Sequence, residues 1–294
     1  MSDEGIDFDG LADGMREFAA AWDAVAYHCG DPTPPSSRCA LEATVLPSSV
    51  EAPEQLTRSI AQDSAVYVTA AAQHVRALAR LLGPEVVLTG WTVTRSVDEY
   101  CGRVAWLLAT DVEPINRVAR FYMERIVGLH MARVSENNIG HRARAKEFRK
   151  AREATIAQAR TMFPDIVLYG EDGPNEWIVG GEQYSSLRKA VNDFGRERLH
   201  RPGLYDMLSS FTHPALARLK EQTRVTQLEN RLHQAFIAEP EVIRWQMAVA
   251  CGSVYSAAQH VISYLGLDDS PLEQWADQHP ELMGWSLSSR DVES

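Results

Sequence analysis

Cysteine is scarce in this chain of 294 residues, which holds only Cys29, Cys39, Cys101 and Cys251 and has no Cys-x-x-Cys pair. Disulfide frameworks and cysteine-only zinc sites need cysteines that are more numerous or more closely spaced. The sequence therefore argues against both, and we expect four buried free thiols.

Long apolar runs are also missing. No stretch reaches the roughly 18 to 20 consecutive apolar residues of a membrane-spanning helix, and no basic segment followed by an apolar run stands at the N-terminus. We therefore expect a cytoplasmic protein without a membrane partner. With 45% hydrophobic and 23% charged residues, the composition is that of a folded domain rather than a disordered chain.

Several catalytic motifs are absent. The sequence has no Walker A loop, no Gly-x-Gly-x-x-Gly loop, no Gly-x-Ser-x-Gly elbow and no His-Glu-x-x-His motif. Asp268, Asp269 and Glu273 resemble the acidic magnesium motif of terpene cyclases, but they stand at a predicted helix start, where carboxylates are favourable for capping. We therefore expect no metal site, and the sequence indicates no particular cofactor.

Positive charge is in short supply, because the net charge is −11. Residues 1–63 hold 3 basic and 12 acidic side chains, and residues 239–294 hold 2 and 9. Residues 141–160 reverse this balance with 7 basic and 2 acidic side chains, which we interpret as a solvated helix face. The acidic total argues against a nucleic acid as partner.

Helical periodicity dominates what is present. It predicts an all-α, multi-helix bundle with a small β-hairpin insertion near residues 165–180, where two β-prone runs flank a Gly/Asp/Pro/Asn cluster. Residues 1–57 are predicted as an acidic N-terminal helix followed by a Pro/Ser-rich surface connector, and residues 58–294 as the bundle domain. The expected helices span 58–82, 92–108, 114–134, 143–163, 184–199, 204–211, 214–236 and 241–265.

A first polar stripe lies on the expected helix 92–108. Arg95, Glu99 and Arg103 are spaced four residues apart and so share one side of the helix. Apolar residues cover most of the remaining circumference, which predicts a nearly buried helix. Buried charges must be paired, and two arginines with one glutamate leave one positive charge over.

A second stripe follows on the expected helix 114–134, with Arg117, Arg120 and Glu124 at spacings of three and four residues. Guanidinium groups match the geometry of carboxylates and phosphates. We therefore expect the arginines of both stripes, held by the glutamates, to bind a small anionic molecule between helices. A purely structural polar network is the alternative, because it produces the same pattern.

A third stripe lies in the segment "LYDMLSSFTHP", where Tyr205, Ser209 and His213 recur every four residues. If this stripe faces the same space, Ser209 adds a ligand-binding hydroxyl. His213 and Tyr205 would then be the catalytic groups, because an imidazole exchanges protons near neutral pH. The three stripes together predict a binding site with acid–base chemistry.

Two other function classes stay open. Arg125 and His130 have the Arg-x4-His spacing that resembles the signature of HEPN ribonucleases of toxin and defence systems, although Ile126 stands where that family commonly has a polar residue. A noncatalytic protein-interaction module is the second alternative, with the polar stripes serving only to fix the register of the helices. The oligomeric state, a homodimer included, is likewise open.

The segments "RSVDEYCGRVAWLL", "RVARFYMERI" and "YDMLSSFTHP" resemble a loose set of uncharacterised, mostly helical actinobacterial proteins. These proteins share an Arg-x3-Glu helix ending in Trp-Leu-Leu and a distal Tyr-x2-Leu-Ser…His element. The resemblance covers residues 90–135 and 200–216 and carries no assigned activity. It implies that the three stripes belong to one site, and we expect a small-molecule-binding protein, plausibly an enzyme of specialised metabolism.

Overall fold

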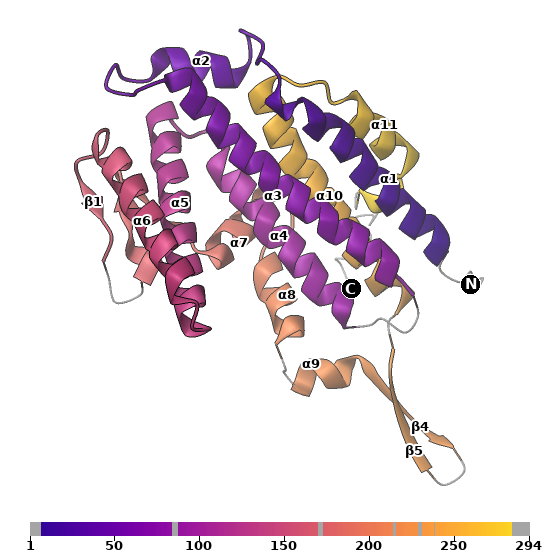
Figure 1. Cartoon of the computed structure of the whole chain (residues 1–294). Helices are drawn as coiled ribbons and strands as arrows, with labels where there is room; N and C mark the ends of the chain where they lie inside the picture. Colours follow the sequence, from indigo (N-terminus) through magenta and orange to yellow (C-terminus); the bar gives the residue numbers. More distant parts are fainter. Residues whose placement is uncertain are drawn as a thin grey trace.

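The computed structural model describes residues 7–83, 88–169, 173–213, 216–228, 231–237 and 239–283. These residues form an all-α bundle with two small antiparallel sheets, as predicted (Figure 1). The α-helices are α1 Phe8–Ala26, α2 Arg38–Val45, α3 Pro53–Leu81, α4 Thr89–Leu107, α5 Pro114–Asn138, α6 Arg142–Arg160, α7 Leu187–Arg198, α8 Leu204–Thr212, α9 Leu216–Glu221, α10 Pro240–Leu265 and α11 Ser270–Gln278. Short 3-10 helices are η1 Tyr27–Gly30, η2 Gly173–Glu176 and η3 Pro280–Leu282.

Helix α3 lies at the centre of the bundle and packs against α1, α4 and α10 (Figure 1). Its start is fixed by Pro53 in the first turn, where the missing N–H costs no helical hydrogen bond. Much of its buried surface is alanine, including Ala61, Ala71 and Ala72, which have no exposed surface. Small side chains let neighbouring helices approach closely, so the alanine-rich sequence places α3 in the middle.

The N-terminal segment contributes to the same core as the rest of the bundle. Met15, Phe18 and Trp22 of α1 are fully buried in the main hydrophobic cluster. The connector expected on the surface contains a helix of its own, α2, because Ser37 accepts a hydrogen bond from the amide of Ala40 and caps it. Figure 1 shows α2 lying across the ends of α3 and α5.

The hairpin predicted near residues 165–180 is confirmed. Strand β1 (Ile166–Val167) pairs antiparallel with β2 (Ile178–Val179), which also pairs with β3 (Glu182–Gln183). The turn between β2 and β3 uses Gly180 and Gly181 at φ values of +56° and +82°, which glycine adopts without strain. A Cβ on Gly180 would also collide with the ring of Phe163.

The helix predicted over residues 214–236 is wrong. The structure has the short α9 followed by an antiparallel hairpin of β4 (Thr223–Leu228) and β5 (Arg231–Phe236). The segment Thr-Arg-Val-Thr favours a strand because β-branched side chains fit a pleated backbone better than a helix. In Figure 1 this hairpin projects from the body beyond α9.

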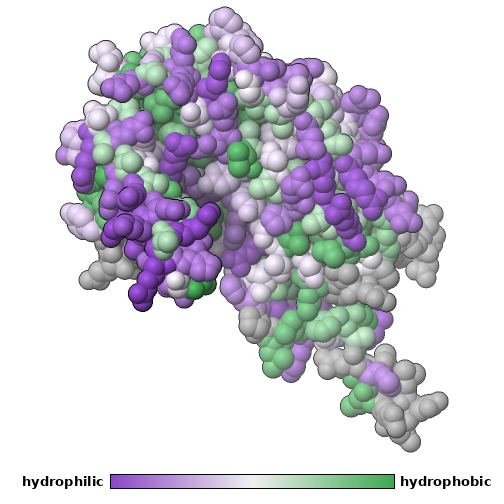
Figure 2. Space-filling view, viewed as in Figure 1, coloured by the Kyte–Doolittle hydropathy of each residue, from purple (hydrophilic) through white to green (hydrophobic). Residues whose placement is uncertain are grey.

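A second hydrophobic cluster lies apart from the main core. Trp91, Leu204, Leu208 and Val249 join α4, α8 and α10, and Phe211 stacks on Trp91 at a ring separation of 4.0 Å. Figure 2 shows hydrophobic side chains gathered over α8 and α9, whereas hydrophilic ones cover α6. The search of the described residues found no helix with the length and hydropathy needed to cross a membrane.

Candidate functional site

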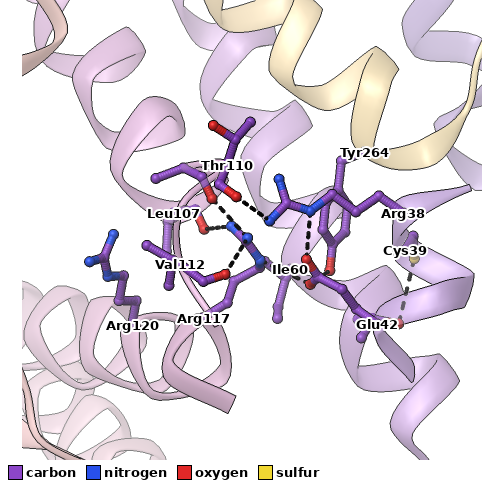
Figure 3. Close-up of polar contacts among 12 residues, drawn as sticks. Arg38, Cys39, Glu42, Ile60, Leu107, Thr110, Val112, Arg117, Arg120 and Tyr264 are labelled. Atoms are coloured by element: carbon purple, nitrogen blue, oxygen red, sulfur yellow. Dashed lines mark hydrogen bonds and ion pairs between the residues drawn. The ribbon is translucent and has the colours of Figure 1, made fainter. Parts of the chain in front are cut away.

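Arg117 stands at the centre of a buried polar network (Figure 3). Its Nε donates to Glu42 Oε2 at 2.9 Å, and Nη1 donates to the carbonyl of Leu107 at 2.8 Å. Nη2 donates to the carbonyls of Ala109 at 2.8 Å and Val112 at 3.2 Å. Three of these acceptors are carbonyls at the end of α4 and in the loop after it, where no helical donor remains. Arg117 therefore caps the C-terminus of α4.

Glu42 is the common acceptor of this network. Arg38 Nε donates to its Oε1 at 2.7 Å, and the Tyr264 hydroxyl donates to its Oε2 at 2.8 Å. Burial lowers the pKa of Arg117, with Glu42 opposing the shift, and burial together with Glu42 raises the pKa of Tyr264. The network joins α2, α5 and α10, and all its hydrogen-bond partners come from the chain itself.

Arg103 forms a second buried network. It donates to the carbonyl of Ser185 at 2.6 Å and to the Tyr184 hydroxyl at 2.7 Å, and its Nε lies 3.7 Å from Glu124 Oε2. The Tyr67 hydroxyl donates to the other oxygen of Glu124 at 2.7 Å. Burial and the Glu124 charge raise the pKa values of both tyrosines. Arg103 thus turns away from Glu99 and toward α5.

Arg120 and Glu182 form a third pair, with Nε donating to Oε2 at 2.6 Å. Arg120 also donates to the carbonyl of Trp106 at 2.8 Å, and its guanidinium lies over the Trp106 ring. In Figure 3 it lies to one side of the Arg117 network. Glu182 belongs to β3, so this ion pair fixes the small sheet to α5.

Arg95 joins one end of the first stripe to the third stripe. It pairs with Glu99 at 2.9 Å, and it donates to the hydroxyls of Tyr205 and Thr212, both at 2.9 Å. His213 Nε2 lies 3.5 Å from Arg95 Nη1 and the residue is exposed. The cluster ties α8 to α4.

Ser209 enters this cluster through its backbone, because its carbonyl accepts a hydrogen bond from Thr212 at 3.1 Å. The residues of the three stripes are therefore divided among four clusters that do not coincide with the stripes, and each stripe arginine has a carboxylate partner. The surplus positive charge expected from the two stripes is neutralised by Glu42 and Glu182, which lie outside both.

The HEPN-like pair does not converge in the structure. Arg125 is exposed and pairs with Asp63 at 3.0 Å, whereas His130 packs edge-on against the ring of Trp177. Residues five apart on an α-helix differ in direction by roughly 140°. Arg125 and His130 therefore point to different neighbours on α5.

A sizeable cavity lies away from these clusters. A groove of about 860 Å³ runs along α10, facing the C-terminal end of α7 and the loop after it; we call it the α7–α10 groove. Its apolar wall includes Leu199, Trp245 and Val249, which also belong to or pack on the second hydrophobic cluster. The groove is thus the open side of that cluster.

Four arginines line the α7–α10 groove: Arg38 of α2, which pairs with Glu42, Arg198 at the end of α7, Arg201 after it, and Arg244 in α10. Among the described residues, none of the last three has a carboxylate partner. Two of the glutamates lining the groove are engaged elsewhere, Glu197 with Arg196 and Glu281 with His279. Glu241 in the first turn of α10 lines the groove as well, so its wall presents three guanidinium groups without an ion pair together with one further carboxylate, beside apolar surface.

These arginines were missed by the sequence reasoning. The segment "RERLHRPG" at residues 196–203 was assigned to a helix end, where basic side chains are common because they favour the negative end of the helix dipole. The clustering of basic residues around Arg198 and Arg201 was the one available signal. No signal in the sequence pointed to Arg244, since only the fold brings α10 beside the end of α7.

A second cavity of about 700 Å³ adjoins the groove. Thr110, Glu197, Arg198 and His260 line both cavities. Its other walls come from α4, α7 and the β3 region and are more polar. Of the nine residues predicted for the site, Arg120 is the one that lines either cavity.

His260 lies where the two cavities meet. Its side chain is 9% exposed, and its Nε2 is buried without a hydrogen-bond partner in the described part of the chain. Burial, together with the charges of Arg198, Arg117 and Arg38, lowers its pKa from 6.5 to about 4. The imidazole is therefore neutral at pH 7 and can donate one hydrogen bond and accept another.

Comparisons with protein-family models, curated proteins and solved structures returned no match to this chain. The resemblance to helical actinobacterial proteins is untested by these comparisons and stays a prediction. Within the described ranges, no three His, Cys, Asp or Glu side chains are grouped as they would be to hold a metal ion.

Proposed function

We propose that the protein binds a small organic anion, a carboxylate or a phosphate, in the α7–α10 groove. The observation that carries the proposal is the set of three groove arginines without carboxylate partners, whereas the arginines of the stripes on α4 and α5 are each paired with a glutamate. A guanidinium group recognises both kinds of anion through paired hydrogen bonds. The proposed ligand class is the one expected from the sequence, but the proposed binding site is the α7–α10 groove and not the three stripes.

The size and lining of the groove fit such a ligand. Pockets for small molecules usually measure roughly 300 to 1,000 Å³ and combine apolar walls with a few polar groups, and the groove measures about 860 Å³. Trp245 and Val249 offer apolar contact for the body of the ligand, while Arg198 and Arg201 hold its charge. Neutral His260 adds a hydrogen-bonding group that does not itself attract the anion.

A thermal-shift screen of aromatic and aliphatic carboxylates and phosphates tests this proposal. A ligand at 100 times its dissociation constant stabilises a protein by about 2.7 kcal/mol. We expect at least one compound to raise the melting temperature, and the rise to vanish in the double variant Arg198→Gln/Arg201→Gln. The matched control is Arg188→Gln, on the same helix; Arg188 and its partner Asp206 both lie outside the two cavities.

The control must keep the rise in melting temperature. A ligand-induced rise that persists in the double variant contradicts the proposal, and so does a panel in which no anion raises the melting temperature of the wild-type protein.

Acid–base catalysis by Tyr205 and His213 also remains a proposal. The contact of Arg95 with both side chains supports it, because the guanidinium group brings the Tyr205 hydroxyl and the His213 imidazole together beside α4. These residues line neither cavity described above, so binding in the groove and catalysis are separate questions. Once a ligand is known, turnover that is unchanged in His213→Gln would rule out this role.

Protein–protein interaction is a second candidate function, favoured by the β4–β5 hairpin. The pairing register puts Val225, Leu232 and Phe236 on one face, where they are 57%, 77% and 48% exposed. A two-stranded hairpin is marginally stable alone, so an apolar face of this kind favours a partner. Sedimentation of wild type against Leu232→Ser tests it: an identical, monomeric mass for both excludes self-association through this face.

A further inference from the structure

The second cavity meets the α7–α10 groove at a junction of four residues. Thr110, Glu197, Arg198 and His260 line both cavities. The first three are exposed to solvent, whereas His260 is buried. The junction therefore has exposed side chains at its rim and the imidazole at its floor, and Arg198 can be reached from either cavity.

The two cavities differ in charge. The groove wall carries four arginines and three glutamates, whereas the wall of the second cavity carries three basic and four acidic side chains. Within the second cavity, Arg120 pairs with Glu182 at 2.6 Å and Lys189 pairs with Asp193 at 2.5 Å. An anion is thus favoured in the groove and not in the second cavity, which suits an uncharged part of a ligand.

The second cavity offers many hydrogen-bonding groups to such a part. Its paired basic and acidic side chains keep further N–H groups and lone pairs beyond those used between them. The side chains of Asp111 and Asn175 form no hydrogen bond within the described part of the chain. The Trp106 ring, which packs edge-on against Tyr184 at 5.8 Å, adds a flat apolar surface. Hydroxyl groups on a carbon skeleton match this combination, because each hydroxyl both donates and accepts.

The floor of the junction lacks one hydrogen bond. The Nε2 atom of His260 is buried and has no partner among the described residues. A buried polar atom left without a partner costs free energy. A hydroxyl group held at the junction would supply that partner, since the neutral imidazole both donates and accepts.

We propose that the ligand is an anionic sugar, a sugar phosphate or a sugar acid, whose hydroxylated part occupies the second cavity while its anionic group contacts Arg198 in the groove. The inference rests on the proposed function of the groove and adds the class of ligand. A site that hydrogen-bonds hydroxyl groups discriminates against an analogue that lacks them, because its own polar groups are then left unpaired.

Isothermal titration calorimetry with matched pairs of compounds tests the proposal. Glucose 6-phosphate is compared with hexyl phosphate, and gluconate with hexanoate, so that each pair shares its anionic group and its carbon number. We expect at least one of the two sugars to bind about tenfold or more tightly than its partner without hydroxyl groups. Methyl glucoside, which has no charge, should bind more weakly than the preferred anionic sugar.

Two variants locate the hydroxylated part. Gln183 and Lys189 line the second cavity and not the groove, and both are exposed, so Gln183→Met/Lys189→Met removes polar groups without opening the core. This double variant should lose most of the preference for the sugar and keep its affinity for the alkyl anion. Arg188→Met is the matched control on α7, because Arg188 is exposed and lines neither cavity. It should bind every compound as the wild-type protein does.

Equal affinities within both pairs overturn the inference. A preference for the sugar that is unchanged in Gln183→Met/Lys189→Met also overturns it, because the hydroxyl groups are then bound elsewhere. If the anions in either case still lose affinity in Arg198→Gln/Arg201→Gln, the proposed function stands and only the class of ligand is lost. If methyl glucoside binds as tightly as the anionic sugars and the double variant of the second cavity weakens it, the proposed function fails and the sugar site stands.

Discussion

Asp98 offers the most quantitative test of the fold. It is fully buried in α4, and its Oδ1 accepts a hydrogen bond from Ser253 of α10 at 2.5 Å. Its Oδ2 has no partner in the described residues. Burial raises the pKa of this carboxyl from 3.8 to about 8, with the Ser253 hydrogen bond opposing the shift. Asp98 is therefore protonated in the folded protein at pH 7.

The raised pKa makes stability depend on pH. Between pH 3.8 and about pH 8 the unfolded chain releases the Asp98 proton and the folded chain keeps it. The free energy of unfolding then falls as pH rises, by about 1.36 kcal/mol per pH unit for this group. From pH 5 to pH 7 the contribution of Asp98 falls by about 2.7 kcal/mol.

Asp98→Asn should remove this contribution. The amide keeps an acceptor for Ser253 and cannot ionise, so it mimics the protonated acid. Urea unfolding at pH 5, 6, 7 and 8 should show wild-type stability falling more steeply than that of the variant, by about 2.7 kcal/mol between pH 5 and pH 7. The exposed Asp13→Asn should keep the wild-type slope. Parallel pH profiles for wild type and Asp98→Asn would refute the reasoning.

Two further predictions concern buried contacts. Arg117→Met removes the donors at the end of α4 and leaves the buried Glu42 carboxylate without this partner, so it should lower the free energy of unfolding by about 3 to 5 kcal/mol. Arg125 is exposed on the same helix, and Arg125→Met should change the free energy of unfolding by about 0.5 kcal/mol or less. Equal losses in denaturant unfolding would contradict this account. Gly180→Ala should lower the free energy of unfolding more than Gly181→Ala, because both glycines adopt positive φ but only Gly180 faces the Phe163 ring. Thermal unfolding of the two variants tests this prediction. Equal melting temperatures would contradict the contact with Phe163.

The sequence alone was sufficient for features that depend on near neighbours. Helical periodicity located the long helices, with Pro114 marking the start of one of them, and the turn-forming cluster after residue 169 located the first hairpin. The spacing of Arg95 and Glu99 predicted an ion pair that the structure contains. Such signals succeed because residues within one or two turns have few geometric choices. The β4–β5 hairpin was missed because a short segment that mixes apolar and polar residues fits both the helical and the strand periodicity.

Only the tertiary structure decided which charges meet between helices. Glu42 reaches Arg117 across 75 positions of sequence, and this contact turns a predicted ligand-binding arginine into part of the core. Arg198 and Arg244 face one groove because α7 ends beside α10, which no local pattern encodes. Long-range pairing is set by how whole helices pack, and one misplaced partner changes whether an arginine is neutralised or free to bind.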